Sequence, residues 1–198
     1  MKRILLHVCC ANCAIYPLKR LEQDEIEVFG FFYNPNIHPF QEYLRRREAV
    51  ESFFRSQGTR LIIQDEYDLE GFLRDVVFRE GNRCSYCYHR RLETAARTAK
   101  KGKFDAFTTT LLHSKHQRHE MIREIGGSLG RRFGIPFYYQ DFRVGWKEGI
   151  EESRSWTSTA RSIVGAYTVK RRGIWEKAGV RQRGRRFERR PRQPAPCR

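Results

Sequence analysis

Cysteine is the residue type whose spacing in this 198-residue sequence most clearly indicates chemistry. Five of the six cysteines lie in two short windows, which hold Cys9, Cys10, Cys13, Cys84 and Cys87. Adjacent cysteines can hardly bond to each other without strain, because the ring that connects them is too small for relaxed disulfide geometry. Clustered thiolates of this kind are ligands of zinc or of an iron–sulfur cluster.

Two thiol pairs form the sharpest hypothesis, Cys9 with Cys10 and Cys84 with Cys87. Together they supply the four thiolates that either zinc or a [4Fe–4S] cluster accepts. Structural zinc ribbons usually combine two Cys-x-x-Cys turns, and an adjacent pair is an unusual half of such a site, so the pattern favours the cluster. The spacing leaves Cys13 open as a spare ligand, a ligand of a second metal or a packed side chain.

The segments around the cysteines predict an α/β fold. Apolar and β-branched runs alternate with helical segments of about ten residues or more, which indicates a mostly parallel, Rossmann-like sheet with helices on both faces. Strands are expected at residues 4–8, 27–33, 61–64, 104–108 and 135–139, and helices at residues 14–23, 40–56, 69–78, 90–101 and 116–133. Open sheets bind their ligands beyond the carboxyl ends of the strands. The first cysteine window occupies that position, so we expect the metal site there.

Two polar segments near predicted strand ends are weaker candidates. His38 lies in the proline- and asparagine-rich loop 34–39, where it is either a substrate contact or a solvent-facing side chain on a rigid connector. Thr108, Thr109 and Thr110 follow one another at a strand end. They suit hydrogen bonds to a phosphate or ribose, and they equally suit the end of an ordinary strand.

The histidines and a mixed aromatic segment form a third group of candidates. His113, His116 and His119 are spaced three apart, and the last two would bind a metal from one helix face. Because no carboxylate completes a recognised metal motif, a surface or hydrogen-bonding role is favoured. Residues 138–143 (YYQDFR) combine aromatic and ionic groups, which suits stacking on a base as well as an ordinary core edge.

Charge is distributed unevenly along the chain. Residues 1–154 hold 26 Lys and Arg against 21 Asp and Glu, which gives +5, and residues 155–198 hold 13 against 2, which gives the remaining +11 of the total +16. The body therefore permits an RNA or phosphate partner without requiring one. No apolar run approaches the roughly 20 residues that span a bilayer, and no secretory signal is evident. We expect a cytoplasmic protein with no membrane partner, where clustered cysteines bind metals more often than they form disulfides.

Six motifs match a known family in their order along the chain. They are residues 6–10 (LHVCC), 30–39 (GFFYNPNIHP), 84–88 (CSYCY), 91–96 (RLETAA), 107–112 (FTTTLL) and 137–143 (FYYQDFR). The chain thereby resembles the QueH-type epoxyqueuosine reductases over about residues 1–154. The resemblance implies a catalytic α/β domain that reduces epoxyqueuosine to queuosine at the wobble position of tRNA, without cobalamin.

The same resemblance implies a cofactor and partners. It indicates that Cys9, Cys10, Cys84 and Cys87 hold a [4Fe–4S] cluster, and it makes Cys13 a candidate ligand of an additional iron ion. The partners are the anticodon loop of a tRNA that carries epoxyqueuosine and an electron donor. A modest positive field would help to seat that loop, whose wobble base can be splayed out and read by stacking.

The chain departs from the family after residue 154. Members resemble one another there in a segment ending in Cys-Gly-Cys, a redox-active thiol pair that this chain lacks. Codons can be chosen for residues 156–170 that, when read in a frame starting one base earlier, encode Leu-Asp-Leu-Tyr-Arg-Gln-Lys-Tyr-Cys-Gly-Cys. This is a segment of the family type. We therefore expect a single-nucleotide frameshift near residues 153–155. It would make residues 155–198 an aberrant basic tail, partly or wholly disordered, in which Cys197 does not replace the lost pair.

Two other functions fit the residues less well. The first is a non-catalytic RNA-binding module with a structural zinc in the four-cysteine site. The second is a nucleotide-dependent tRNA-thiolating enzyme on a similar frame. The sequence contains no glycine-rich or Ser-Gly-Gly loop that would cradle a phosphate after the first strand, which argues against the second.

Overall fold

The computed structural model describes residues 2–155. The tail proposed from the sequence lies outside the described residues, apart from residue 155 at the end of the last helix. The strands are β1 (Arg3–His7), β2 (Glu27–Phe32), β3 (Leu61–Ile63) and β4 (Ala106–Thr109). The helices are α1 (Ala11–Gln23), α2 (Phe40–Ser56), α3 (Leu69–Val76), α4 (Arg83–Lys101), α5 (His119–Phe133) and α6 (Trp146–Ser155). Three short 3-10 turns are η1 (Glu80–Asn82), η2 (Thr110–His113) and η3 (Phe142–Gly145).

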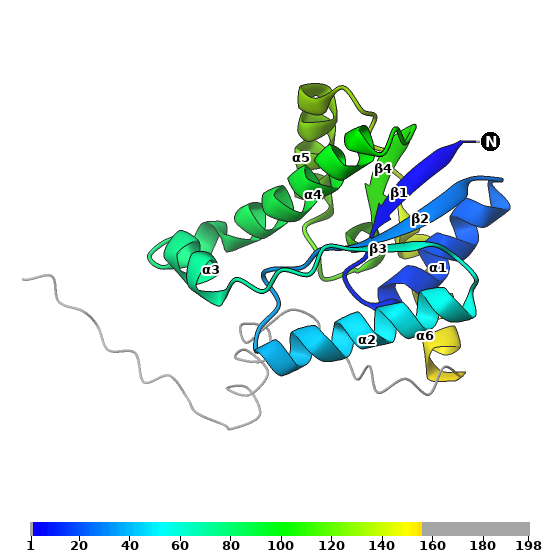
Figure 1. Cartoon of the computed structure of the whole chain (residues 1–198), viewed down its shortest axis with the longest axis horizontal. Helices are drawn as coiled ribbons and strands as arrows, with labels where there is room; N and C mark the ends of the chain where they lie inside the picture. Colours follow the sequence, from blue (N-terminus) through cyan, green and yellow to red (C-terminus); the bar gives the residue numbers. More distant parts are fainter. Residues whose placement is uncertain (1, 156–198) are drawn as a thin grey trace, which may run out of the picture. The chain divides into compact units, whose positions relative to one another are not determined.

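The four strands form one parallel sheet in the order β3-β2-β1-β4. The chain passes from β1 to β2 and β3 in one direction, and then returns to place β4 on the other side of β1. Right-handed crossovers in opposite directions place their helices on opposite faces of a sheet. Accordingly, α1 and α2 lie on one face, with α6 against α1, while α4 and α5 pack together on the other (Figure 1). The predicted α/β fold is confirmed.

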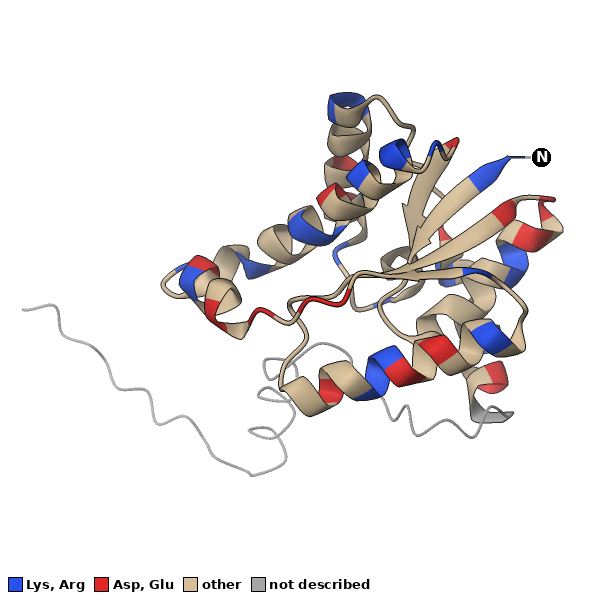
Figure 2. Ribbon diagram, viewed as in Figure 1, with Lys and Arg blue, Asp and Glu red and all other residues tan. Residues whose placement is uncertain are grey.

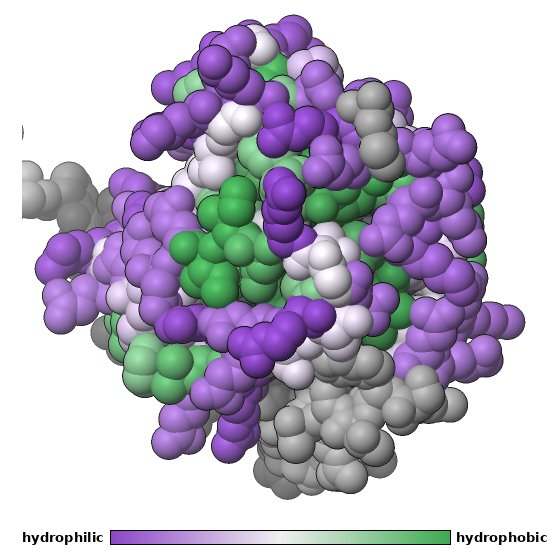
Figure 3. Space-filling view, turned by 45° about the vertical axis from the view of Figure 1, so that its right-hand side comes forward, coloured by the Kyte–Doolittle hydropathy of each residue, from purple (hydrophilic) through white to green (hydrophobic). Residues whose placement is uncertain are grey.

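The core lies between the sheet and these two helical layers. β1 is buried along Ile4, Leu5 and Leu6, as a central strand covered on both faces should be. The apolar side chains of α2, such as Tyr43 and Phe54, are buried as well. In the space-filling view, hydrophobic surface shows at the centre of one face and hydrophilic residues border it (Figure 3). Within the described residues, every helix is too short or too polar to traverse a membrane.

One predicted strand is wrong. Residues 135–139 make only an isolated bridge, in which Phe107 donates its N–H to the Pro136 carbonyl and accepts from the N–H of Tyr138. Pro136 has no N–H of its own, so this segment cannot form a regular ladder through that position.

Two helices begin earlier than predicted, and both changes affect the cysteines. α1 begins at Ala11 rather than residue 14, which places Cys13 in its first turn. α4 begins at Arg83 rather than residue 90, so that Cys84 and Cys87 lie on the helix itself. Neither glycine nor proline occurs between Arg83 and Lys101, and nothing interrupts the hydrogen-bonded turns.

Candidate metal centre

The turn between β1 and α1 gathers three thiols. Cys9 is buried, whereas Cys10 and Cys13 are partly exposed. The three sulfur atoms all lie within 4.8 Å of one another, and those of Cys9 and Cys10 are 3.9 Å apart. Cys13 is therefore a member of this three-cysteine group rather than a side chain packed elsewhere. Three sulfur donors in this arrangement suit a metal that prefers thiolate ligands, or they could supply part of the ligands of an iron–sulfur cluster.

Thr110, the first residue of η2 after the end of β4, holds the first of these cysteines in place. Its hydroxyl accepts a hydrogen bond from the N–H of Cys9 at 3.1 Å and donates one to the Cys9 sulfur at 3.3 Å. The hydroxyl of Thr109 lies 2.9 Å from Nδ1 of His7 and accepts from the N–H of Leu111. The threonines singled out in the sequence are fully buried. Two of them thus hold the cysteine turn in place through these internal contacts.

The three clustered thiols differ in acidity. Hydrogen bonds from Cys10 and Cys13, with help from Thr110 and Arg91, lower the pKa of Cys9 well below its usual value despite burial. The hydrogen bond with Cys13 lowers the pKa of Cys10. The hydrogen bond with Cys9 and burial act in the opposite direction and outweigh this effect, so that the pKa of Cys10 rises to about 12. Hydrogen bonding to Cys10 and Cys9, and then burial, raise the pKa of Cys13. The group therefore favours one thiolate, at Cys9, supported by two thiols.

The second thiol pair lies near the start of α4. Cys84 and Cys87 are three residues apart on a helix, which places them on one face. Both are partly buried. Burial raises the pKa of Cys87, and the positive charge of Arg91 acts in the opposite direction. Arg91 also lowers the pKa of Cys9, after the hydrogen bonds from the other thiols. The same guanidinium therefore acts on a cysteine from each window.

Asn34 links the predicted loop to both windows. It is fully buried, and its amide nitrogen donates to the carbonyl of Val8 at 2.9 Å, one residue before the clustered cysteines. Its amide oxygen lies 3.5 Å from a guanidinium nitrogen of Arg91. Arg91 in turn donates from Nε to the carbonyl of Cys87 at 3.1 Å. A chain of polar contacts therefore runs from the first cysteine window to the second.

His38 is not the solvent-facing side chain that the connector interpretation expected. Its ring packs against Tyr67 and Phe72, with centroids 5.1 and 4.9 Å away. Both ring nitrogens are buried without a hydrogen-bond partner among the described residues. Phe72 also lines a small pocket beside Cys87 and Tyr86. Pro35 and Asn36 of the same loop line this pocket together with Cys87, so the loop borders the second thiol pair.

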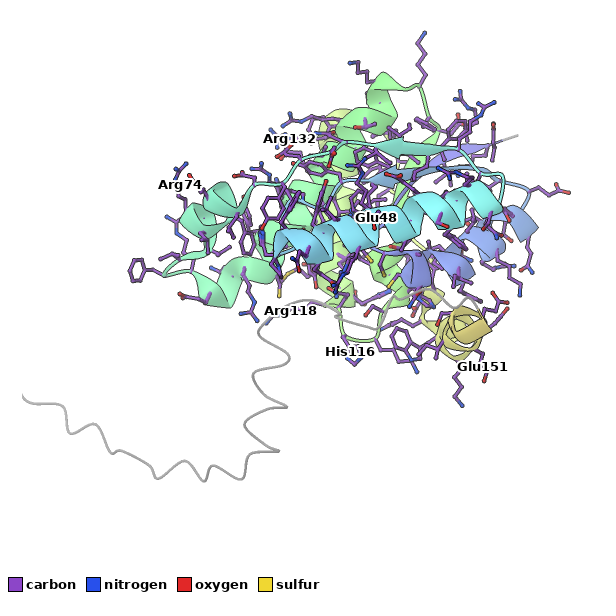
Figure 4. All side chains as sticks on the ribbon, turned by 60° about the horizontal axis from the view of Figure 1, so that its bottom comes forward. Glu48, Arg74, His116, Arg118, Arg132 and Glu151 are labelled. Atoms are coloured by element: carbon purple, nitrogen blue, oxygen red, sulfur yellow. The ribbon has the colours of Figure 1, made fainter. Side chains whose placement is uncertain are left out.

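The three spaced histidines do not converge on one another. His113 is buried and packs against Tyr16 and Trp146. His116 lies at the surface, on the segment that precedes α5 (Figure 4). His119 is buried, with Nε2 3.3 Å from the carbonyl of Leu112. Among the described residues, the group of metal-binding type contains the three cysteines and none of these histidines.

The segment 138–143 makes local ionic contacts. Hydrogen bonds from Arg143 lower the pKa of Asp141 to about 2. Asp141 also lies 3.5 Å from Nε2 of His119. Tyr139, which packs edge-on against that histidine, remains 38% exposed. The guanidinium carbon of Arg123 lies over this ring, 4.9 Å from its centre.

The family model described as "Epoxyqueuosine reductase QueH" matches residues 4–159. This match covers most of the chain and contains both cysteine windows. The chain belongs to the QueH family of epoxyqueuosine reductases. A QueH protein of Dehalococcoides mccartyi is 34% identical over 142 residues, covering 71% of this chain and 78% of the relative. A second QueH protein, from Thermotoga maritima, is 34% identical over 164 residues, covering 78% and 83%.

Similarity to solved structures extends the fold beyond the QueH family. A predicted subunit of a tRNA methyltransferase from Methanocaldococcus jannaschii superposes with a TM-score of 0.57 at 12% identity, covering 90% of this chain and 89% of that one. At this identity the likeness concerns the α/β fold alone.

Sequence reasoning missed two arginines at the QueH site. Arg46 on α2 is only 15% exposed in its side chain and pairs with Glu42 at 2.7 Å. Its charge also acts on Cys10. Arg91 was noted as part of a motif, but its burial was not foreseen. Arginines on an amphipathic helix are normally solvated. Which of them is buried depends on the elements that pack against the helix, and the sequence alone does not identify these.

We predict that Thr110→Val weakens the fold more than Thr108→Val. The first change removes the acceptor of the Cys9 N–H, and leaving that buried donor unsatisfied costs about 1–3 kcal/mol. The hydroxyl of Thr108 is buried without a hydrogen-bond partner among the described residues, so its removal should be neutral or stabilising. Urea unfolding without oxygen, in a thiol reductant, measures both. Equal effects of the two substitutions would contradict the role assigned to Thr110.

Proposed function

We propose that this chain reduces epoxyqueuosine in tRNA to queuosine. Membership of the QueH family carries the proposal, because the match spans the sheet and both cysteine windows. The geometry supports it: the three-cysteine group lies just beyond the carboxyl end of β1, between the two parallel neighbours of that strand. Open α/β sheets bind their ligands at such a position. Because tRNA is a cytoplasmic substrate, we place the protein in the cytoplasm.

We further propose that Cys9, Cys10, Cys84 and Cys87 hold a [4Fe–4S] cluster, with Cys13 as a ligand of an additional iron ion. The donors are all soft sulfur ligands, and one thiolate is favoured at Cys9. The group of thiols that lie together consists of Cys9, Cys10 and Cys13, so Cys84 and Cys87 would have to complete the cluster site from α4. Such a cluster supplies electrons at low potential when bound, so that no cobalamin is needed. Thr110 and Asn34 then keep the first thiol pair in place through their contacts with Cys9 and Val8.

The proposed reaction has a simple balance. Converting an epoxide to the alkene breaks two C–O bonds, takes two electrons and two protons, and releases the oxygen as water. The electrons come from an external donor. His7 lies within two residues of the cysteines, but burial and the Arg91 charge lower its pKa to about 4. Its neutral ring bridges Thr109 and the Tyr33 carbonyl and so serves as a structural link.

An exposed aromatic residue near α3 suits the RNA partner. Phe78 is 94% exposed, and Arg74 and Arg79 lie close to it in the sequence. The Arg74 side chain projects into solvent from α3 (Figure 4). Aromatic rings stack on unpaired bases, and guanidinium groups bind phosphates. This combination supports an anticodon loop as the partner without specifying which base is bound.

We propose that the tail after about residue 154 arises from a frameshift that replaces the Cys-Gly-Cys segment of the QueH family. The regrouped codons of residues 156–170 support this. The cluster ligands all precede the change. The chain as given should therefore load its metal but turn over slowly.

The reductase activity is tested in a bacterium that lacks its own epoxyqueuosine reductase. With the reading frame restored, we expect tRNA nucleosides to shift from epoxyqueuosine to queuosine, as followed by mass spectrometry. Cys9→Ser in the same restored chain should return the content to the background, because it removes a proposed cluster ligand. Persistent epoxyqueuosine with the metal-loaded, restored chain would refute the function.

The frameshift is tested by comparing the chain as given with the frame-restored version. We expect lower reductase activity from the given chain at equal metal content, since only the restored one carries the Cys-Gly-Cys pair. Resequencing the DNA across codons 150–160 provides the independent check. Equal activity of the two versions, or an unambiguous in-frame read, would contradict the proposal.

A further inference from the structure

Arg91 is a buried cation without a carboxylate partner among the described residues. It lies on α4, one turn after Cys87, and is only 6% exposed. Its polar contacts are neutral: Nε donates to the carbonyl of Cys87 at 3.1 Å, and Nη1 lies 3.5 Å from the amide oxygen of Asn34. Its guanidinium carbon is 6.0 Å from the centre of the Tyr88 ring. A buried charge is costly unless an opposite charge balances it.

Other arginines of the same helix do have acidic partners. Arg90 pairs with Glu66 at 2.8 Å and approaches Asp68 at 3.6 Å. These acids belong to the acidic segment between β3 and α3, which is red on the ribbon of Figure 2. Arg97 pairs with Glu93 at 2.9 Å. Arg91 differs from these two arginines because it is buried and has no carboxylate partner among the described residues.

Arg91 is tied to the backbone of both cysteine windows. Its Nε donates to the carbonyl of Cys87 at 3.1 Å. Asn34, whose amide oxygen lies 3.5 Å from Nη1 of Arg91, donates to the carbonyl of Val8, the residue before Cys9. The contacts with Asn34 and the Cys87 carbonyl hold the guanidinium in place between the two windows.

We propose that Arg91 is a positioning residue that supplies the counter-charge of the thiolate site. Its guanidinium balances the negative charge of the cysteines and therefore favours metal binding and a more negative, reduced state of the bound centre. The inference rests on the thiolate centre of the proposed function. It does not require that the substrate be epoxyqueuosine.

The first test measures Zn²⁺ affinity of the metal-free chain without oxygen, by competition with a chelator. We expect Arg91→Gln to weaken binding about tenfold, the size of one partly screened charge interaction. Arg91→Lys should stay near the wild-type value, because it keeps the charge but loses the guanidinium fork. Arg97→Gln is the matched control on the same helix, whose exposed ion pair is remote from the thiols, and it should have no effect.

The second test is the midpoint potential of the reconstituted centre, followed by a redox titration. Arg91→Gln should shift the potential to a more negative value, and Arg91→Lys should restore it. Equal effects of the two substitutions would show that Arg91 acts through its shape and hydrogen bonds, and an unchanged Zn²⁺ affinity in Arg91→Gln would overturn the proposal. If Arg91→Gln does not fold, Arg91→Lys decides, because loss of metal binding in that variant contradicts a counter-charge role. Both measurements concern the metal site alone, so a failure of tRNA reduction would not change their interpretation.

Discussion

The central place of β1 in the parallel sheet is the constraint on which the site depends. β1 pairs with β2 on one side and with β4 on the other, so the crossover from β1 to β2 and the crossover from β3 to β4 run in opposite directions. Their helices cover opposite faces, and the end of β1 opens between them (Figure 1). Cys9 and Cys10 follow this strand directly. A shift of β4 to another edge would remove Thr110 from Cys9 and α4 from the reach of the first thiol pair.

Buried polar contacts turn this topology into a defined site. Thr110 joins the cysteine turn to the end of β4, and Asn34 joins it to the end of β2. Arg91 extends the same set of contacts to the Cys87 carbonyl. A buried polar group that loses its partner is costly, so these contacts favour one arrangement of the backbone around the thiols. The QueH cysteines are held by three elements that lie far apart in the sequence.

The sequence was sufficient for the α/β class, because strong apolar periodicity marks β1, β2 and α2. It was also sufficient to single out the cysteines, whose clustering is improbable in a chain with only six. It misplaced the start of α4, since the motif around Cys84 resembles a loop knuckle when tertiary packing is unknown. It also assigned a strand to residues 135–139, where β-branched and aromatic content outweighed the missing donor of Pro136.

Contacts between distant segments lay beyond the reach of sequence patterns. Thr108, Thr109 and Thr110 are equivalent in the sequence, yet only the last contacts Cys9. Arg90 and Arg91 are adjacent, yet Arg90 forms an ion pair with Glu66, whereas Arg91 is buried without a carboxylate partner among the described residues. The direction of each side chain is set by the register of β4 and by the face that α4 turns to the sheet. Both follow from packing across more than fifty residues of intervening chain.

The most direct measurement is the iron and acid-labile sulfide content of the chain purified without oxygen, together with its visible spectrum. The proposed ligands all precede residue 154, so the frameshift proposed for the tail should not affect the answer. Four cysteines holding one cluster predict about four irons and four sulfides per chain, with broad absorption near roughly 400 nm. A single, tightly held zinc without sulfide would contradict the cluster and make the cysteines a structural site.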